Sequence, residues 1–408
     1  MLKKLKSLLS YQNLIIATLA LVVLKILYIT VFQKEFLGNE DFLIAKNVVQ
    51  YHQYSQFINQ GGTAFKLPVY PYVISFFILL QGTNALIGLA VFQAILSFFI
   101  PLLIYKIINL FGFKDVGILA GFLFICSPAY FLYPGIIEAT NIFVPILLLW
   151  FYLYFRVWIL SEIRTLDFII LGIVTALLSL TQVVICPLAF LMIVALLFFK
   201  KIDFKGFTII FFVAMVFYSP WVIRNYYVFD KIVLSKTPAW QNIYFGFTPK
   251  GQLLDDLKLV SKKRDHYLYQ MSDTVSELTM ENIYKNEVMK ATNKEPHYFI
   301  KKAASNFLCL WFVPPKYFED NSLPVLAGRK IYVIILNILT LLSLACLYKK
   351  SRLLFWFSLL LFANFSVPYM IGHAANMRFK LDFEWYQLIL VSYLIIELSK
   401  SHKKNAPV

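Results

Sequence analysis

Long apolar runs separated by short polar segments make up most of this chain. The main runs cover about 13–32, 86–109, 116–133, 141–158, 168–184, 186–199, 206–222, 331–348, 353–371 and 384–398. Several of them approach the roughly 20 residues that a helix needs to cross about 30 Å of hydrocarbon. The pattern predicts an all-α polytopic membrane protein built as a bundle of about ten transmembrane helices.

A further apolar run, at about 69–80, is too short to be counted with the others. It is bounded by Pro68 on one side and by Gln81-Gly82 on the other. A helix rises only about 1.5 Å per residue, so a run of this length does not span the hydrocarbon core. We therefore expect it to form an interfacial or re-entrant helix.

The distribution of Lys and Arg predicts the orientation of the chain. If the short run does not cross, the basic clusters between spans all fall on the side of the N-terminal lysines: Lys106 with Lys114, Arg156 with Arg164, Lys200 with Lys201 and Lys205, Lys349 with Lys350 and Arg352, and the tail Lys400–Lys404. Short cytoplasmic loops are enriched in these residues. We expect a protein of the cell inner (plasma) membrane with both termini in the cytoplasm.

This topology divides the chain into three parts. Residues 1–222 form an N-terminal transmembrane module whose first external loop, 33–85, is extracytoplasmic. Residues 223–330 form a small extracytoplasmic helical subdomain, with amphipathic helical periodicity from Val275 to Asn293, and residues 331–408 are C-terminal transmembrane helices.

Composition excludes two other classes of protein. The chain is 60% hydrophobic and 15% charged, whereas soluble domains have about 25% charged residues. The net charge of +16 comes largely from the topological clusters, so it does not indicate nucleic-acid binding. The four cysteines lack the spacing of a disulfide framework or a metal site.

The predicted outer face carries several groups of residues with chemical potential. Glu40 and Asp41 follow the first span, and a carboxylate there can act as a general base or can simply favour a helix start. Lys66 and Tyr70 lie in the Pro-rich stretch before the short run, which is also typical of a loop-to-helix junction. Glu138 lies in the next external segment.

The remaining candidates lie beside later spans. Trp221, Arg224 and Asn225 end one span, where an interfacial aromatic belt with a snorkelling Arg is the alternative. His373, Arg378 and Lys380 precede the last span, where a local pair between Arg378 and Asp382 is the alternative. Together, Lys66, Arg224, Arg378 and Lys380 place four cations on the face that should be poor in them, which indicates a phosphate ligand.

In sum these motifs resemble those of GT-C fold glycosyltransferases, and most closely the dolichyl-phosphate-mannose protein mannosyltransferase and aminoarabinose-transferase-like group. The stretches that carry the resemblance are the acidic pair Glu40-Asp41, residues 65–71 (Phe-Lys-Leu-Pro-Val-Tyr-Pro), Ser127-Pro128 to Glu138, residues 220–226 (Pro-Trp-Val-Ile-Arg-Asn-Tyr), Glu277 to Trp311 and Arg378-Phe379-Lys380. They cover most of the chain in the family's order. The family's acidic residue usually stands further ahead of its small-residue helix than Asp41 does of Ala45, which makes Glu40 a rival for its role.

The resemblance implies transfer of a sugar, hexosyl or pentosyl, from a polyprenyl-phosphate carrier to an extracytoplasmic acceptor, with inversion. Asp41 or Glu40 would be the base, and Lys66, Arg224, Arg378 and Lys380 would hold the donor phosphate. Glu138, Tyr70, Trp221, Asn225 and His373 would contact the acceptor, the sugar or a metal. No cofactor is required, and a divalent metal is possible. The expected partners are the lipid donor and membrane lipid, with no nucleic acid.

Three other classes of function are alternatives to a glycosyltransferase. A transporter or flippase should show an internal repeat and charges at mid-membrane, and neither is evident in the sequence. A polysaccharide polymerase or ligase that uses diphosphate-linked glycans has a similar composition, and donor identity separates it from a monophosphate enzyme. A non-catalytic scaffold leaves the external cations without an explanation.

Overall fold

The computed structural model describes residues 9–33, 35–36, 38–160, 162–293, 295–313, 322–373 and 378–404. Within these ranges the chain forms helices and no strands. The α-helices are α2 (Tyr11–Leu27), α3 (Glu40–Tyr51), α4 (Val69–Gln81), α5 (Ala85–Leu96), α6 (Phe99–Leu110), α7 (Lys114–Ile125), α8 (Pro128–Leu132), α9 (Thr140–Ile159), α10 (Thr165–Ser179), α11 (Cys186–Phe198), α12 (Phe204–Phe229), α13 (Trp240–Phe245), α14 (Lys262–Met271), α15 (Glu277–Thr292), α16 (His297–Phe312), α17 (Leu323–Lys350), α18 (Arg352–Ile371) and α19 (Arg378–Lys404). The all-α prediction is confirmed.

Six described helical segments are long and apolar enough to cross a membrane: Tyr11–Phe32, Val69–Leu110, Thr140–Ile159, Phe204–Phe229, Leu323–Lys350 and Arg352–Ile371. A seventh is possible if α7 and the segment Pro128–Gly135, which meet at 62°, form one broken span. The chain is therefore a multi-pass membrane protein. The expected number of ten spans stays a prediction, because α10 and α11 are shorter apolar helices.

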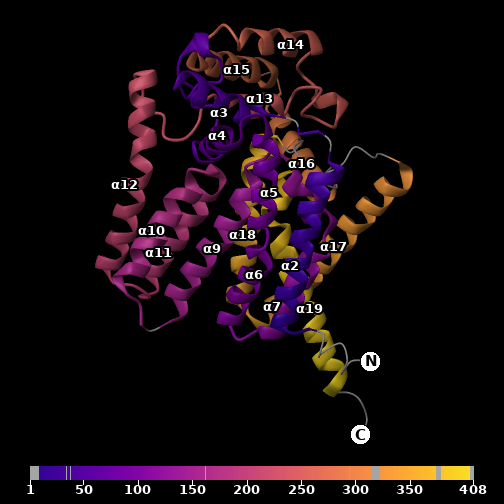
Figure 1. Ribbon diagram of the computed structural model, residues 1–408. Helices are drawn as coiled ribbons and strands as arrows, with labels where there is room; N and C mark the ends of the chain where they lie inside the picture. Colours follow the sequence, from indigo (N-terminus) through magenta and orange to yellow (C-terminus); the bar gives the residue numbers. More distant parts are fainter. Residues whose placement is uncertain are drawn as a thin grey trace.

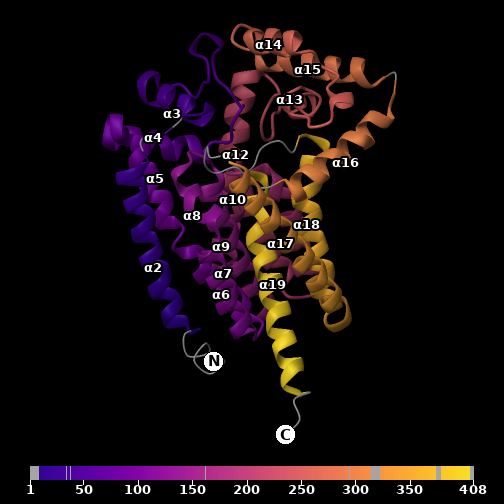
Figure 2. The same ribbon diagram turned by 90° about the vertical axis from the view of Figure 1, so that its right-hand side faces the viewer.

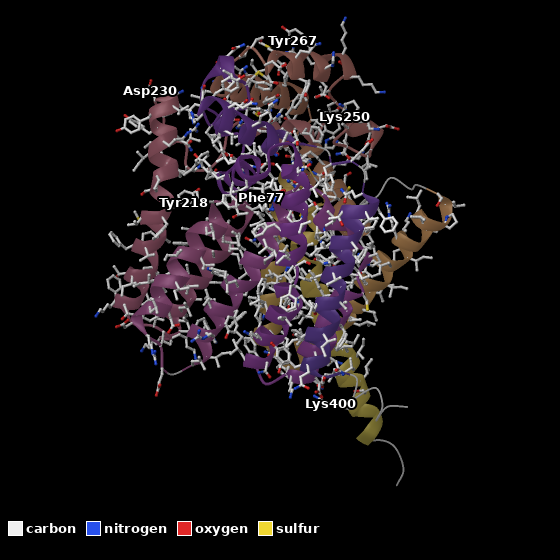
Figure 3. All side chains as sticks on the ribbon, in the orientation of Figure 1. Phe77, Tyr218, Asp230, Lys250, Tyr267 and Lys400 are labelled. Carbon is white, nitrogen blue, oxygen red and sulfur yellow. The ribbon has the colours of Figure 1, made fainter. Side chains whose placement is uncertain are left out.

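The helices form a bundle with a cap at one end. In Figure 1, α2 begins and α19 ends at the lower end of the bundle, whereas α3, α4 and α13 to α15 lie at the upper end. Turning the molecule by 90° keeps α13, α14 and α15 above the bundle (Figure 2). Asp230, Lys250 and Tyr267 mark the upper end in Figure 3, and Lys400 marks the lower one. We call the upper end the cap end and the lower end the terminal end. The N-terminal lysine cluster used for the topology lies outside the described residues.

The short apolar run forms α4, a helix of 13 residues. It ends at Gly82, whose φ of 54° places it in the left-handed region that glycine adopts at little cost. α4 packs against α3 and α5, with Ile74 and Tyr70 buried in a cluster that also contains Ala45 and Leu89. The run is thus a separate helix beside the first external loop, and whether it enters the membrane stays a prediction.

The cap helices between α12 and α17 have an apolar cluster of their own. Tyr244, Phe247, Leu268, Met280 and Tyr284 are among its buried members. The predicted amphipathic helix over 275–293 is confirmed, since α15 runs from Glu277 to Thr292. α12 continues past residue 222 to Phe229, and the predicted extracytoplasmic segment 223–330 stays a prediction.

Helix α16 joins this cap to the bundle through the exposed carbonyls at the end of α18. The Asn306 side chain donates to the carbonyls of Tyr369 and Met370 at 3.2 and 3.1 Å, and Lys302 Nζ donates to the Ile371 carbonyl at 2.6 Å. The last carbonyls of a helix lack partners within the helix. These contacts therefore fix the cap above the segment that leads to α19.

Candidate active site

The site begins at the first turn of α3. Asn39 is the N-cap of this helix, because its Oδ1 accepts a hydrogen bond from the Phe42 amide at 3.3 Å. Glu40 and Asp41 therefore do not cap the helix, although both carboxylates lie near its positive end. The Asp41 residue is buried, with 3% exposure, whereas the Glu40 side chain is 48% exposed. The two neighbouring acids thus have different environments.

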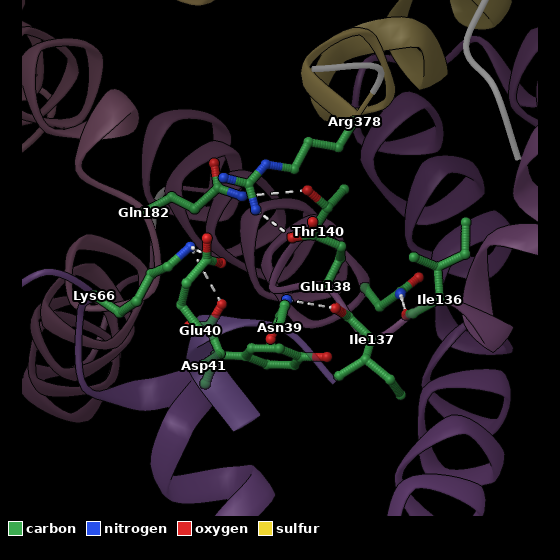
Figure 4. Close-up of polar contacts among 12 residues, drawn as sticks. Asn39, Glu40, Asp41, Lys66, Ile136, Ile137, Glu138, Thr140, Gln182 and Arg378 are labelled. Carbon is green, nitrogen blue, oxygen red and sulfur yellow. Dashed lines mark hydrogen bonds and ion pairs between the residues drawn. The ribbon is translucent and has the colours of Figure 1, made fainter. Parts of the chain in front are cut away.

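Lys66 lies between these two carboxylates (Figure 4). Its Nζ is 3.5 Å from Glu40 Oε2 and 3.5 Å from Asp41 Oδ2. Lys66 lowers the pKa of Glu40, whereas burial raises the pKa of Asp41 in spite of Lys66. Burial acts to lower the pKa of Lys66, but the two acids outweigh it and the pKa is raised. Lys66 thus stays charged, and the pKa values of the two carboxylates shift in opposite directions.

A third carboxylate, Glu138, comes from the loop before α9. Four side-chain amides hold this loop in place by donating to its carbonyls at 2.7–2.8 Å: Gln33 to Gly135, Asn39 to Ile137, Gln93 to Pro134 and Asn141 to Ile136. Glu138 accepts a hydrogen bond from Arg378 Nη1 (Figure 4). Asn39 both caps α3 and holds the loop of Glu138. Its side chain therefore links the position of Glu138 to that of Asp41.

Arg378 reaches Glu138 from the first turn of α19. The sequence left open a local ion pair between Arg378 and Asp382. Arg378 pairs instead with the distant Glu138. The carboxylate of Asp382 accepts instead from the Thr140 and Tyr369 hydroxyls, both at 3.1 Å. The charges of Arg378 and Glu138 act on Asp41 as well, so α3, the Glu138 loop and α19 contribute to one site.

Lys236 is a further cation of this site that the sequence analysis missed. Its neighbour Thr237 donates an amide hydrogen bond to the Ala64 carbonyl at 3.1 Å, which ties the loop after α12 to the loop of Lys66. Burial and the positive charges of Lys66 and Arg378 lower the pKa of Lys236 to about 8, against the attraction of Asp41. Among the described residues, Lys236 forms no ion pair. The charge rule that singled out Lys66 applies equally to Lys236.

The residues at the end of α12 hold the first external loop instead of facing the carboxylates. Arg224 donates to the carbonyls of Thr63 at 2.6 Å and Tyr54 at 2.8 Å, and it stacks on the rings of Tyr54 and Trp221. Trp221 Nε1 donates to the Ser235 carbonyl at 2.7 Å, and Asn225 Nδ2 donates to the Val233 carbonyl at 3.0 Å. Arg224 already has these partners, so we propose a positioning role for it.

Three other candidates lie at the margin of the site. Tyr70 is buried and donates to Gln93 Oε1 at 2.8 Å. Lys380 is buried and donates to the Trp311 carbonyl at 2.8 Å, within the bundle. His373 contacts the rings of Phe245 and Phe379, and burial lowers its pKa to about 3, so its imidazole is neutral. These contacts do not assign a substrate-binding role to any of the three.

The three carboxylates do not form a good metal site. Glu40 and Asp41 share the Lys66 ammonium, and Glu138 is paired with Arg378. The described residues contain no group of three His, Cys, Asp or Glu side chains arranged to hold an ion. A divalent cation would have to displace these positive charges to bind the carboxylates.

Comparison with known proteins identifies the fold. No protein-family model matches the sequence, and no curated protein matches it either. Among solved structures, the oligosaccharyltransferase AglB of Archaeoglobus fulgidus, in complex with an inhibitory peptide and a dolichol-phosphate, aligns over 98% of this chain with a TM-score of 0.52 and 16% identity. A structure of the Archaeoglobus fulgidus oligosaccharyltransferase with zinc and sulfate aligns over 94% with a TM-score of 0.51 and 16% identity. The protein thus has a GT-C-like fold.

These neighbours are considerably longer than the present chain. The alignment covers 53% of the AglB chain in the first structure and 49% of the chain in the second, so this protein spans about half of their length. The search also found ArnT of Cupriavidus metallidurans bound to undecaprenyl phosphate, with a TM-score of 0.41, 11% identity and coverage of 94% of this chain and 78% of that one. The likeness at these identities establishes the fold and leaves activity to the site itself.

Proposed function

We propose that this protein is a membrane glycosyltransferase that transfers a sugar from a polyprenyl-phosphate donor to a hydroxyl of an extracytoplasmic acceptor. The observation that carries the proposal is the buried carboxylate of Asp41, 3.5 Å from Lys66, in a site that also contains Arg378 and Lys236. A base beside a group of cations suits the transfer of a group away from a phosphate. The GT-C-like fold is in keeping with this chemistry.

In the proposed reaction, Asp41 accepts the proton of the acceptor hydroxyl. The hydroxyl oxygen then forms a bond to the anomeric carbon while the bond from that carbon to the phosphate oxygen breaks, and the bonding electrons leave with the phosphate. Because one displacement occurs, the anomeric carbon is inverted. Burial raises the pKa of Asp41, which favours it as a base, whereas Lys66 lowers the pKa of Glu40.

The negative charge that develops on the leaving phosphate needs cations near it. Lys66 and Arg378 remain protonated beside their acids, and Lys236 has no carboxylate pair among the described residues. We propose that Lys236 and Lys66 contact the donor phosphate directly and that Arg378 contributes its charge from behind Glu138. Stabilisation of developing charge by preorganised donors is usually the largest contribution to catalysis.

The lipid that co-purifies with the protein tests this proposal. We expect wild-type protein extracted in mild detergent to retain a polyprenyl-phosphate species detectable by mass spectrometry. The double variant Lys66→Ala, Lys236→Ala should lose at least about nine-tenths of it, since two charge-assisted contacts are removed. The double variant Lys262→Ala, Lys263→Ala removes the same charge from α14 of the cap and should retain the lipid.

Other outcomes of this measurement contradict the proposal. Equal retention by both double variants would rule out the assigned phosphate site. A diphosphate-linked oligosaccharide would favour a polymerase, ligase or flippase instead. If no isoprenoid lipid co-purifies with wild type, the proposed donor is left without support.

A further inference from the structure

An apolar groove beside α11 and α18 opens towards the terminal end of the bundle. The two helices are joined towards the cap end, where Asn364 Nδ2 donates to the Val184 carbonyl at 3.0 Å. Nearer the terminal end lies a cavity of about 290 Å³, lined by apolar and aromatic side chains of α6, α7, α9, α11, α17, α18 and α19. Trp356 is 60% exposed and Leu191 is 50% exposed on its two sides. The groove is therefore open to the surroundings of the bundle.

Cations border this groove at its terminal end. Lys201 lies just after α11, and its Nζ is 5.4 Å from the ring of Trp158, which lines the cavity. Arg352 begins α18, directly before the lining residues Leu353 and Leu354. The guanidinium of Arg352 is 5.8 Å from the ring of Tyr348. Lys201 thus lies beside a ring that lines the cavity, and Arg352 is next in sequence to two residues that line it.

Some of the basic residues at this end of the bundle are already paired with acids. Arg156 is paired with Asp167 at 3.5 Å, and Lys350 is paired with Glu397. Neither Lys201 nor Arg352 has an ion pair with a carboxylate in the described ranges. Asp203, two residues after Lys201, is engaged as the N-cap of α12. An anionic group is the ligand that would complement both free cations.

We propose that this groove binds an anionic glycerophospholipid, with an acyl chain between α11 and α18 and its phosphate between Lys201 and Arg352. Basic pockets between transmembrane helices are suited to anionic headgroups, and a long apolar chain suits the lining. A polyprenyl-phosphate donor is a poorer occupant, because its phosphate belongs at the cap end. The choice of this lipid over the polyprenyl donor rests on the proposed function, whereas the groove and its neighbouring cations do not.

Native mass spectrometry of the full-length protein in detergent tests this site. The protein is titrated with phosphatidylglycerol or with phosphatidylcholine of the same acyl chains. We expect wild type to bind phosphatidylglycerol at least about tenfold more tightly, and the double variant Lys201→Ala, Arg352→Ala to lose that preference. The double variant Lys262→Ala, Lys263→Ala should keep it.

A second variant tests the groove without changing any charge. Ala195 lines the cavity on α11, and Ala195→Trp should fill it and reduce binding of phosphatidylglycerol by a similar factor. Equal binding of the two lipids by wild type would overturn the proposal, as would an equal loss of preference in both double variants. Unchanged binding by Ala195→Trp would place the lipid elsewhere on the protein.

Discussion

At the scale of single residues, the two adjacent acids of α3 have become chemically distinct. Burial raises the pKa of Asp41, whereas Lys66 lowers that of the more exposed Glu40. Lys66 contacts both at the same distance, so solvent access accounts for the difference between them. The structure thus gives a physical reason to prefer Asp41 as the base.

We predict that Asp41→Asn lowers the transfer rate by at least about a hundredfold, because positioned general bases contribute about 10²–10⁴. Glu40→Gln should stay within about tenfold of wild type. Initial rates with equal amounts of folded protein measure this, and thermal unfolding serves as the control for folding. A rate for Asp41→Asn close to that of wild type would refute the assignment of the base.

The pH dependence of Lys66→Met gives a second prediction. Asp41 acts as a base only when it is deprotonated, so activity falls as pH drops through its pKa. Lys66 lowers that pKa, and its removal raises it further. The acidic limb of the pH–rate profile should therefore move to higher pH in Lys66→Met. A shift to lower pH would show that Lys66 does not act on the base.

The third prediction concerns the removal of divalent metal ions. Lys66 and Arg378 already form ion pairs with the three carboxylates of the site. We therefore predict that dialysis against EDTA leaves the transfer rate unchanged. Loss of activity with EDTA, restored by a divalent cation, would show that these ion pairs open to admit a metal.

At the scale of elements, α12 and α15 hold the first external loop from two sides. Arg224 of α12 donates to carbonyls of this loop, and Glu277 of α15 accepts from the Ala64 amide at 3.0 Å and from the Thr63 hydroxyl. Since Lys66 follows directly after, this clamp positions a residue of the site. The family-like motif around Arg224 thus has a structural explanation in addition to its resemblance.

Hydrogen exchange of residues 61–66 should follow the ionisation of Glu277. Burial raises the pKa of Glu277 to about 7, above the value of about 4.3 for an unfolded chain. Its contribution to the clamp is therefore fully present below about pH 4 and is lost as pH rises through 7. Protection of the loop should fall between pH 5 and 8 in wild type, after correction for intrinsic exchange. In Glu277→Gln it should not vary with pH, and a wild-type-like pH dependence in that variant would contradict this account.

The sequence predicted the membrane class and α15 because both depend on local periodicity. It also gave Asp41, Lys66, Glu138 and Arg378 as candidates, but it could not pair the last two, which are 240 residues apart. Lys236 was not singled out, because its segment contains many charged residues. The partners of Arg224 depend on the path of the loop from Tyr54 to Thr63, which has no repeating pattern from which to predict it.

At the scale of the whole molecule, the site and the lipid groove lie at opposite ends of the bundle. The predicted topology places the cap outside the cell and the terminal end in the cytoplasm. This arrangement would keep the acceptor outside while the proposed anionic phospholipid binds from the inner leaflet. The orientation is open to a direct labelling test.

Single cysteines in a background without the four native ones test this topology. We predict that Asn59→Cys and Lys262→Cys, both exposed at the cap end, react with an impermeant maleimide added to intact cells. Lys205→Cys at the start of α12 should react only after the membrane is opened. The reverse pattern would place the site in the cytoplasm.

The most direct test of the central claim is the mass of the isoprenoid lipid that co-purifies with wild type and with Asp41→Asn. If Asp41 is the base and the donor is a polyprenyl-phosphate sugar, the variant should accumulate the lipid with its sugar attached, whereas wild type should carry mainly the discharged polyprenyl phosphate. Identical lipids with the same proportion of sugar in both proteins would contradict the account.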